Sequence, residues 1–367
     1  MRRSFKFRIY PTKKQSEKLE STLEVCRELY NAALQEWRDA WKLNRISINF
    51  HSQKDQLPEI KQLRPELNDI HSQVLQDVLK RLDKTRKAFY SRVKRKEKAG
   101  FPRFKSKSRY NSFCYPQSGF RIDGHKLHLS KIGAVHFRQS RAIKGTIKTL
   151  TILKENGKWH AVFSCDEVPK QPLPKTSNEV GIDVGIEYFA ALSTGKTFQN
   201  DRFYEKSQKK LRSLQRHKAR CVKGSRRYKE AARQIHVLHV HIRNRRSDFQ
   251  HKLANRLINE YDRIVIEDLS IKGLAKGFLA KQVSDAAWGA FIQKLEDKAE
   301  RADRIVVKVN PSGTSQTCLC GNRVEKKLFQ RWHDCPSCGY SERRDVVSAK
   351  VILQRAGSAH SAANTTH

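Results

Sequence analysis

Asp183 lies inside an otherwise apolar segment, residues 180–185, that has the composition of a buried strand. A carboxylate in the middle of such a strand is expensive unless it is paired or bound to a metal. Glu267 ends another apolar run, and Asp345 opens the last helical segment. Each of these acids could be a metal ligand, although Glu267 could instead cap a turn and Asp345 could be an ordinary helix N-cap. Any fold of this chain must therefore give Asp183 a partner.

Basic residues outnumber acidic ones two to one. The 367 residues include 75 Lys and Arg and 37 Asp and Glu, which gives a formal net charge of +38. Residues 80–109 hold 14 basic and 2 acidic residues, and residues 202–256 hold 18 and 3. Charge of this size attracts polyanions, so we expect a nucleic-acid partner. Tyr110, Phe113 and Tyr115 are candidates for base stacking, with packing inside a sheet as the alternative.

The remaining composition favours a soluble cytoplasmic protein with no membrane partner. No apolar run approaches the roughly 18 residues that indicate a membrane span, and the first residues lack the apolar core of a signal peptide. Eight cysteines in a chain of this length are too few for a disulfide scaffold. Four of them are scattered, and we expect them to be packing residues: Cys26, Cys114, Cys165 and Cys221.

The first half of the chain predicts a β-barrel with helices inserted into it. Residues 5–9 alternate as a half-buried strand, and residues 110–168 are rich in strands, with a tight hairpin at Asn156-Gly157. Between them, residues 70–82 and an earlier stripe have helical periods. We expect the whole stripe to be core: Leu19, Leu23, Cys26, Tyr30, Ala33, Trp37 and Trp41.

The second half predicts a mixed α/β unit. A proline-rich linker at 168–178 precedes two strands that turn near Thr194-Gly195, and basic helices follow at 202–256. Two short buried strands, 263–267 and 304–309, flank an amphipathic helix at 287–302. A helix at 346–354 completes the pattern, and the polar tail from Gly357 is expected to be disordered.

Four cysteines are spaced as a metal site: Cys318-x-Cys320, fourteen residues, then Cys335-x-x-Cys338, with a glycine after each pair. Tetrahedral zinc with four thiolates is the natural assignment, and it would be structural because no coordination position stays open. The upstream pair is one residue short of the usual gap, so a degenerate ribbon with an idle reduced pair is the alternative. His333 could substitute as a ligand, although its nearness to Cys335 favours a surface position.

Three histidines, His236, His239 and His241, suggest a second metal site. Their spacing does not place all three on one helical face, so we expect surface or nucleic-acid contacts instead. No role can be derived for His251.

Several segments together resemble the TnpB family of transposon-encoded RNA-guided DNA nucleases, which are relatives of the type V CRISPR effectors. Residues 180–196, 263–274, 288–318 and 344–353 carry the resemblance in the second half. Residues 5–15, 103–113 and 244–253 extend it over almost the whole chain.

The resemblance implies a multidomain α+β and α/β architecture. A WED-like β-barrel would span 1–11 and 109–170, with a REC-like helical recognition module inserted at 12–108. After a linker at 171–178, an RNase H-like RuvC nuclease domain would comprise 179–311 and 341–356. A zinc ribbon would occupy 312–340, and 357–367 would be the tail.

The resemblance also implies a chemistry for the acids. Asp183, Glu267 and Asp345 would converge and hold two Mg²⁺ ions that catalyse DNA hydrolysis, leaving 5′-phosphate and 3′-hydroxyl ends. The sequence departs from the family pattern near the last acid. Arg343 stands where members often have Asp, and Val347 stands where they often have Asn. These departures leave metal binding possible but put secondary positioning roles in question.

The partners implied are a guide RNA from the transposon end (omega RNA) and double-stranded target DNA, bound by a nucleoid-associated monomer with one RNA. Pairing with the guide would read the sequence, and the protein would read a short flanking motif. One alternative is a guide-RNA-bound repressor that does not cut. A guide-independent nuclease is disfavoured because it would not need residues 1–175.

Overall fold

The computed structural model describes residues 1–277, 279–327 and 330–363. The chain forms two compact units, Met1–Pro169 and Lys170–His367. No helix in the described residues is long and apolar enough to cross a membrane.

The first unit is built on one antiparallel sheet of seven strands in the order β2-β6-β7-β1-β5-β4-β3. Its strands are β1 (Arg3–Tyr10), β2 (Ser112–Tyr115), β3 (Phe120–Asp123), β4 (Lys126–Leu129), β5 (Gly133–Arg138), β6 (Thr146–Glu155) and β7 (Lys158–Asp166). The first strand pairs with β7 and β5, as the predicted barrel requires. Strands far apart in the sequence thus share this sheet.

The sheet curls until its two edge strands approach each other. The rings of Tyr115 on β2 and Phe120 on β3 have centroids 6.4 Å apart. The Tyr115 hydroxyl donates a hydrogen bond of 3.1 Å to the carbonyl of Ser130. The hairpin between β6 and β7 turns at Asn156 and Gly157, whose φ angles of 51° and 71° are those of the tight turn expected there.

The inserted helices share one hydrophobic core with the sheet. They are α1 (Lys13–Asn44), α2 (Phe50–Asp55), α3 (Leu57–Leu63) and α4 (Ser72–Lys94), with short 3₁₀ turns at Pro65–Asp69 and Lys107–Arg109. The Thr12 hydroxyl and the Gln15 side chain form the capping box that starts α1. The predicted stripe on α1 is buried except at its end: Trp41 is 50% exposed, because it lies beyond the reach of the core.

The proline-rich segment after β7 is not a free linker. The backbone N–H groups of Gln171 and Leu173 donate to the carbonyls of Arg301 and Ala302. Thr176 donates from both its backbone and its hydroxyl to the Asp262 carboxylate. The predicted linker therefore belongs to the second unit, since its backbone polar groups are satisfied there.

The second unit contains a mixed sheet of five strands in the order β10-β9-β8-β11-β12. Its strands are β8 (Glu179–Asp183), β9 (Tyr188–Leu192), β10 (Thr197–Gln199), β11 (Arg263–Glu267) and β12 (Ile305–Val309). Strands β8, β11 and β12 are parallel, and β9 and β10 are antiparallel additions. The predicted turn at Thr194-Gly195 joins β9 to β10. The sequence predicted two strands in this region, whereas the structure has three. The predicted burial of the last strand was wrong, because β12 is an edge and Ile305 is 60% exposed.

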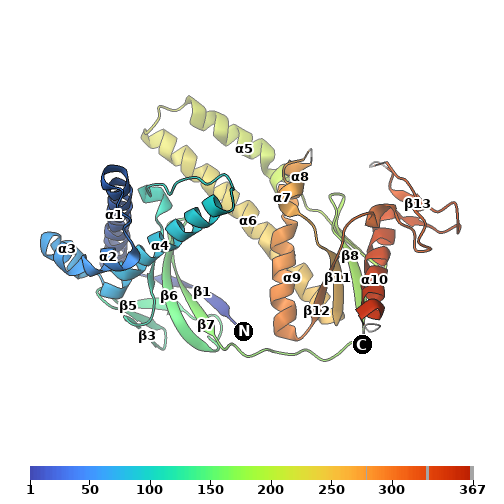
Figure 1. Cartoon of the computed structure of the whole chain (residues 1–367), viewed down its shortest axis with the longest axis horizontal. Helices are drawn as coiled ribbons and strands as arrows, with labels where there is room; N and C mark the ends of the chain where they lie inside the picture. Colours follow the sequence, from blue (N-terminus) through green and yellow to red (C-terminus); the bar gives the residue numbers. More distant parts are fainter. Residues whose placement is uncertain (278, 328–329, 364–367) are drawn as a thin grey trace. The chain divides into compact units, whose positions relative to one another are not determined.

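Helices cover both faces of this sheet (Figure 1). The helices of this unit are α5 (Phe203–Arg220), α6 (Arg226–Glu260), α7 (Ile271–Leu274), α8 (Ala280–Ala286), α9 (Trp288–Ala302) and α10 (Arg344–Ala363). Of these, α6 and α9 pack on one face of the sheet and α10 packs on the other. The predicted basic region forms the hairpin of α5 and α6. The prediction of a disordered tail from Gly357 was wrong for residues 357–363, because α10 continues to Ala363. Residues 364–367 lie outside the described residues.

Alternation along the strands decides which side chains meet α10. Val180 and Ile182 on β8, and Ile264 and Ile266 on β11, face the core made with α6 and α9. The intervening Val265 packs with Ile352 of α10. Because successive side chains point to opposite faces, Asp183 and Glu267 belong to the α10 face.

Gly181 sets how close α10 can come to β8. A Cβ at this position would lie 2.0 Å from the Ala349 carbonyl oxygen and 2.9 Å from the backbone nitrogen of Leu353. These are backbone atoms of α10 and cannot rotate away. Glycine therefore permits the approach that brings Asp345 toward the end of β8.

We expect Gly181→Ala to lower the free energy of unfolding by about 2–3 kcal/mol, because the added methyl group overpacks the contact between β8 and α10. Urea denaturation of the purified protein measures this. Gly357→Ala is the matched control on the same helix, since a Cβ there meets nothing within 4 Å. Equal stability of the two variants would contradict the close approach.

Candidate metal centre and nucleic-acid surfaces

Three acids meet at one end of the second sheet. Asp183 ends β8 and Glu267 ends the neighbouring parallel strand β11, one residue beyond the paired Ile182 and Ile266. Asp345 lies in the first turn of α10, which packs across both strands. The charges of Glu267 and Asp345 both act on Asp183, so the structure brings the three acids near one another. The sequence signal for these positions was that each acid stands at one end of an apolar segment.

The surroundings of the acids favour their neutral forms. Burial, together with the charges of Glu267 and Asp345, raises the pKa of Asp183 well above its usual range. Burial also raises the pKa of Glu267, although a hydrogen bond from the Thr314 hydroxyl opposes it. The pKa of Asp345 is raised by burial despite the nearby Arg344 guanidinium. Like charges in a poorly hydrated place cannot all ionise at low cost.

We expect Asp183→Asn to gain stability relative to the wild type as the pH rises without added divalent cations. Below about pH 4 the Asp183 carboxyl is protonated in both states. As the pH rises, the Asp183 carboxyl ionises in the unfolded chain but stays protonated in the folded chain. The free energy of unfolding of the wild type therefore falls until the pH passes the raised pKa of Asp183. Urea unfolding from about pH 4 to pH 8 tests this, and a constant difference between the two proteins would contradict it.

The donor set of the three acids fits hard divalent cations. All three offer carboxylate oxygens, and a cation would offset the burial and the repulsion that together raise the pKa of Asp183. Within the described part of the chain, the carboxylates do not form a compact group whose ligand atoms all lie within 4.8 Å. A wider spacing suits ligands that surround a pair of ions about 3.5–4 Å apart.

The four clustered cysteines do form such a compact group. Their sulfur atoms lie within 4.8 Å of one another. The Cys318 and Cys338 sulfurs are 3.7 Å apart, as are those of Cys320 and Cys335. Zn–S bonds of about 2.3 Å in a tetrahedron place the sulfurs about 3.8 Å apart, so the set fits zinc. The short upstream pair does not prevent this geometry.

The cysteine loops are shaped for metal binding. The glycine after each pair, Gly321 or Gly339, has a φ of 90° or 71° and closes its turn. Although burial opposes it, hydrogen bonds from the backbone N–H groups of Cys338 and Ser337 lower the pKa of Cys335 to about 6. A thiolate is the form that binds metal, and Cys335 is the first of the four to ionise, because burial raises the pKa of Cys318 and hydrogen bonds with Cys320 and Cys335 raise that of Cys338.

No histidine of the described residues belongs to the compact metal-binding group. The predicted surface position of His333 was wrong: its side chain is fully buried and its Nδ1 contacts the Lys326 amine. His236, His239 and His241 are exposed on α6, as expected, and the His239 ring stacks at 6.5 Å on Tyr204. His251 is exposed and belongs to no metal group among the described residues.

The scattered cysteines differ in their environments. Cys26, Cys114 and Cys165 are buried, as predicted. Cys221 is half-buried at the end of α5, and its thiol contacts the His217 carbonyl at 3.3 Å. Cys221 is therefore less buried than the other three cysteines, and its thiol contacts the last turn of α5.

The aromatic residues available for stacking are not the predicted ones. Tyr110, Phe113 and Tyr115 are buried, so packing in the sheet, the alternative, is what the structure shows. A different group lies at the surface near the ends of α1 and α4. We call it the aromatic patch: Trp41, Tyr90, Phe101 and Phe104, each 43–50% exposed.

The aromatic patch is rigid and basic. Phe101 stacks on the buried Trp37 with centroids 4.9 Å apart. The Arg38 guanidinium lies 5.3 Å from the Phe104 ring, and that of Arg45 lies 5.7 Å from Trp41. Arginine and aromatic faces side by side are typical of surfaces that stack nucleobases. Sequence periodicity could not find this group because its members come from three separate segments.

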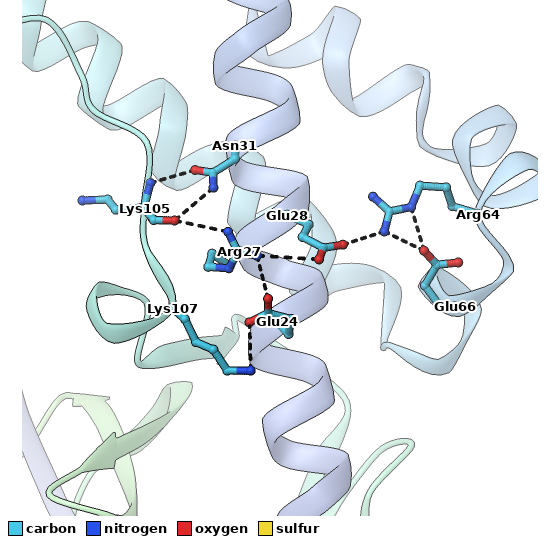
Figure 2. A network of polar contacts seen from close by, with 8 residues as sticks. All are labelled: Glu24, Arg27, Glu28, Asn31, Arg64, Glu66, Lys105 and Lys107. Carbon is cyan, nitrogen blue, oxygen red and sulfur yellow. Dashed lines mark hydrogen bonds and ion pairs between the residues drawn. The ribbon is translucent and has the colours of Figure 1, made fainter. Parts of the chain in front are cut away.

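A polar network holds the basic segment after Phe104 on α1 (Figure 2). The Asn31 amide donates to the Lys105 carbonyl at 3.0 Å and accepts from its backbone N–H at 2.8 Å. The Arg27 guanidinium donates to the same carbonyl, and Lys107 pairs with Glu24 at 3.8 Å. The segment therefore has a fixed backbone rather than the freedom of a solvated loop.

Comparison with known families covers both units. Residues 162–277 match the OrfB_IS605 family, described as probable transposase, and residues 288–352 match the Cas12f1-like TNB domain. Residues 1–45 match a helix-turn-helix domain of the same OrfB_IS605 group. In this chain those residues form β1 and α1.

Two relatives match nearly from end to end. "Putative RNA-guided DNA endonuclease InsQ" of Escherichia coli K12 is 31% identical over 372 residues, covering 95% of this chain and 91% of the relative. The chain belongs to the TnpB family. A "Putative RNA-guided DNA endonuclease" of Streptomyces pristinaespiralis is 33% identical over 366 residues, covering 96% of this TnpB chain and 89% of the relative.

The fold of this TnpB protein is also similar to a solved structure. The Cas12f1 chain in a complex with guide RNA and target DNA aligns with a TM-score of 0.60 at 14% identity, covering 96% of this chain and 98% of that one. At this identity the likeness concerns the fold alone. The full-length relatives at 31% and 33% identity confirm the predicted family, and the mixed α/β architecture with a near-closed sheet agrees with the solved fold.

Proposed function

We propose that the chain is a transposon-encoded, RNA-guided DNA endonuclease that cuts target DNA beside a short flanking motif. The observation that carries this proposal is the meeting of Asp183, Glu267 and Asp345 at one end of the second sheet. The names of the full-length relatives support the same activity. A non-cutting repressor is disfavoured, because it would not need three costly acids in one place.

In this proposal the three carboxylates hold a pair of divalent cations, with Mg²⁺ as the natural choice for oxygen ligands. When bound, such a pair activates the attacking water and stabilises the leaving 3′ oxygen. The chain supplies the positions of the ligands. Parallel pairing fixes Asp183 beside Glu267, the Thr314 hydroxyl orients one Glu267 oxygen, and α10 delivers Asp345.

The same proposal assigns the domains. The second sheet with α10 would be the RuvC-like nuclease, and the cysteine segment with β13 (Trp332–Asp334) and β14 (Ser341–Arg343) would be its zinc ribbon. The near-closed sheet and the helices α1–α4 would be the WED-like and REC-like parts. The aromatic patch and the basic segment fixed by Asn31 support nucleic-acid binding by these helices.

The partners follow from charge. A net charge of +38 favours an RNA that stays bound and a DNA that enters the complex. Phosphate neutralisation releases counterions. The logarithm of the DNA binding constant should therefore fall linearly with the logarithm of the salt concentration, with a slope near −0.9 for each phosphate contact. We expect one guide RNA per monomer, derived from the end of the transposon.

Co-expression with the flanking transposon sequence tests the proposal. The RNA that co-purifies is sequenced, and a plasmid library with a matching target and a randomised flank is challenged with the complex. We expect a discrete RNA and cleavage beside one short motif. If no discrete RNA co-purifies, or no flank supports cutting, the proposed function fails.

A further inference from the structure

The Thr314 hydroxyl that bonds Glu267 lies in a turn at residues 310–316, which leads from β12 to the cysteine segment. Thr314 is 4% exposed and Glu267 is 9% exposed, so little water reaches their contact. The proposed function uses this contact as a support for Glu267. The support is only as rigid as the turn that carries the hydroxyl.

The turn is closed by short-range hydrogen bonds. The backbone N–H of Ser312 donates to the Asn310 side-chain oxygen at 2.9 Å. The Thr317 hydroxyl donates to the Gly313 carbonyl at 2.8 Å. Gly313 has a φ of 74°, which a residue with a side chain rarely adopts. The backbone that carries Thr314 therefore has a defined shape, although it lies outside the sheet.

Arg355 ties this turn to α10. Its Nη1 donates to the carbonyl of Asn310 and to that of Ser312, both at 2.8 Å. The positive charge of Arg355 also acts on Glu267. A guanidinium that bonds two carbonyls of one short turn holds them in a fixed relation, because its donors lie in one rigid plane.

We propose that Arg355 is a positioning residue for the cutting reaction. By fixing the turn at residues 310–314, it aims the Thr314 hydroxyl at one Glu267 oxygen and leaves the other oxygen for the divalent cations. The inference rests on the proposed function, because Glu267 is a ligand only in that proposal.

The Thr314 hydroxyl has two acceptors within reach. It carries one proton, and it contacts both the Glu267 carboxylate and, at 3.1 Å, the Pro311 carbonyl. An ionised carboxylate is the stronger acceptor, so the bond goes to Glu267 while the turn keeps the hydroxyl beside it. Pro311 belongs to the same turn and moves with it. If the turn is released from α10, the hydroxyl can stay with Pro311 and Glu267 loses its partner.

Helix α10 thereby serves two of the three acids. It carries Asp345 in its first turn, and through Arg355 it holds the hydrogen-bond partner of Glu267. Hydrogen bonds to the side chains that bind a metal typically contribute about 10- to 100-fold to metal affinity. The affinity for divalent cations is therefore the quantity that Arg355 should change.

Mn²⁺ binding to the zinc-loaded full-length protein, measured without nucleic acid, tests this role. Mn²⁺ suits the same oxygen ligands as Mg²⁺, and its EPR signal reports the free ion. Asp183→Ala gives the background from other acids. We expect Arg355→Gln to weaken the Asp183-dependent binding about tenfold, and Thr314→Val to weaken it about 10- to 100-fold. Thr314→Ser keeps the hydroxyl and should restore most of the affinity.

Two matched controls separate positioning from a general loss of stability. Arg263→Gln removes another arginine that bonds α10, at the Ala356 carbonyl at 3.1 Å. Thr22→Val removes another buried threonine hydroxyl, which donates to the Lys18 carbonyl at 2.8 Å in the first unit. Both variants should bind Mn²⁺ as the wild type does.

Wild-type affinity in Arg355→Gln, or an equal loss in Arg263→Gln, would overturn the role of Arg355. Thr314→Ser binding as weakly as Thr314→Val would overturn it too, because the hydroxyl would then not be what the turn positions. In target cleavage, the Mg²⁺ concentration at half-maximal rate should rise by the same factors. Failure of the proposed function looks different. In that case the wild-type complex cuts no library target, while the Mn²⁺ comparison among the variants still decides the role of Arg355.

Discussion

Asp183→Ala is expected to lower the rate of target cleavage at least about a thousandfold, because loss of a ligand to the divalent cations removes several kcal/mol of transition-state stabilisation. The same variant should keep its guide RNA and its target affinity, since the basic surfaces are untouched. It should also fold at least as stably as the wild type without cations, because the repulsion around Asp183 disappears. Single-turnover cleavage, filter binding and urea unfolding measure these quantities.

Glu179→Gln provides the control for this experiment. Glu179 begins the strand that Asp183 ends, and it pairs with Arg263 at 3.1 Å at the other end of the sheet. Its loss should leave cleavage within about twofold, since exposed ion pairs contribute little. Equal cleavage by wild type and Asp183→Ala would show that the catalytic assignment is wrong.

The second large effect is expected on the stability of the cysteine segment when its metal is removed. Structural zinc contributes of order 10 kcal/mol to the folding of small domains that bind it. The strands of the cysteine segment, β13 and β14, are only three residues each, so the hairpin alone is a weak scaffold. We expect Cys335→Ser to lose zinc and to expose residues 312–343 to proteases. Cleavage should fall with it, since this segment leads directly into Asp345.

Metal analysis and limited proteolysis measure this outcome, with Cys221→Ser as the control outside the cluster. The wild type should contain about one equivalent of zinc. Less than about half an equivalent would argue against the four-thiolate site. Unchanged protease resistance of Cys335→Ser would show that the segment holds its shape without metal.

The sequence was informative at positions where the wrong environment for a residue would cost much free energy. An acid in an apolar strand demanded an explanation, and Glu267 at the end of one apolar run and Asp345 at the start of another were the acids to consider with it. The hairpin at Asn156-Gly157 was also predictable, because only a tight turn suits those residues. These signals are local and need no knowledge of the tertiary fold.

Features set by tertiary contacts were not predictable. Burial of His333 depends on the packing of Lys326 and the cysteine loops, which its distance from Cys335 does not reveal. The aromatic patch joins α1, α4 and the segment after them, and Trp41 belongs to it only because the core ends one turn earlier. The role of Gly181 likewise follows from a helix that is far away in the sequence.

The order of the three acids along the chain has a consequence for synthesis. Asp183, Glu267 and Asp345 come from the first strand, a middle strand and the last helix of the second unit, whereas the first unit ends at residue 169. Domains generally fold as units as they leave the ribosome. The part proposed to hold RNA can thus be complete while the cutting centre still lacks its third acid. A nascent or prematurely terminated chain could therefore complete its first unit without being able to cut DNA.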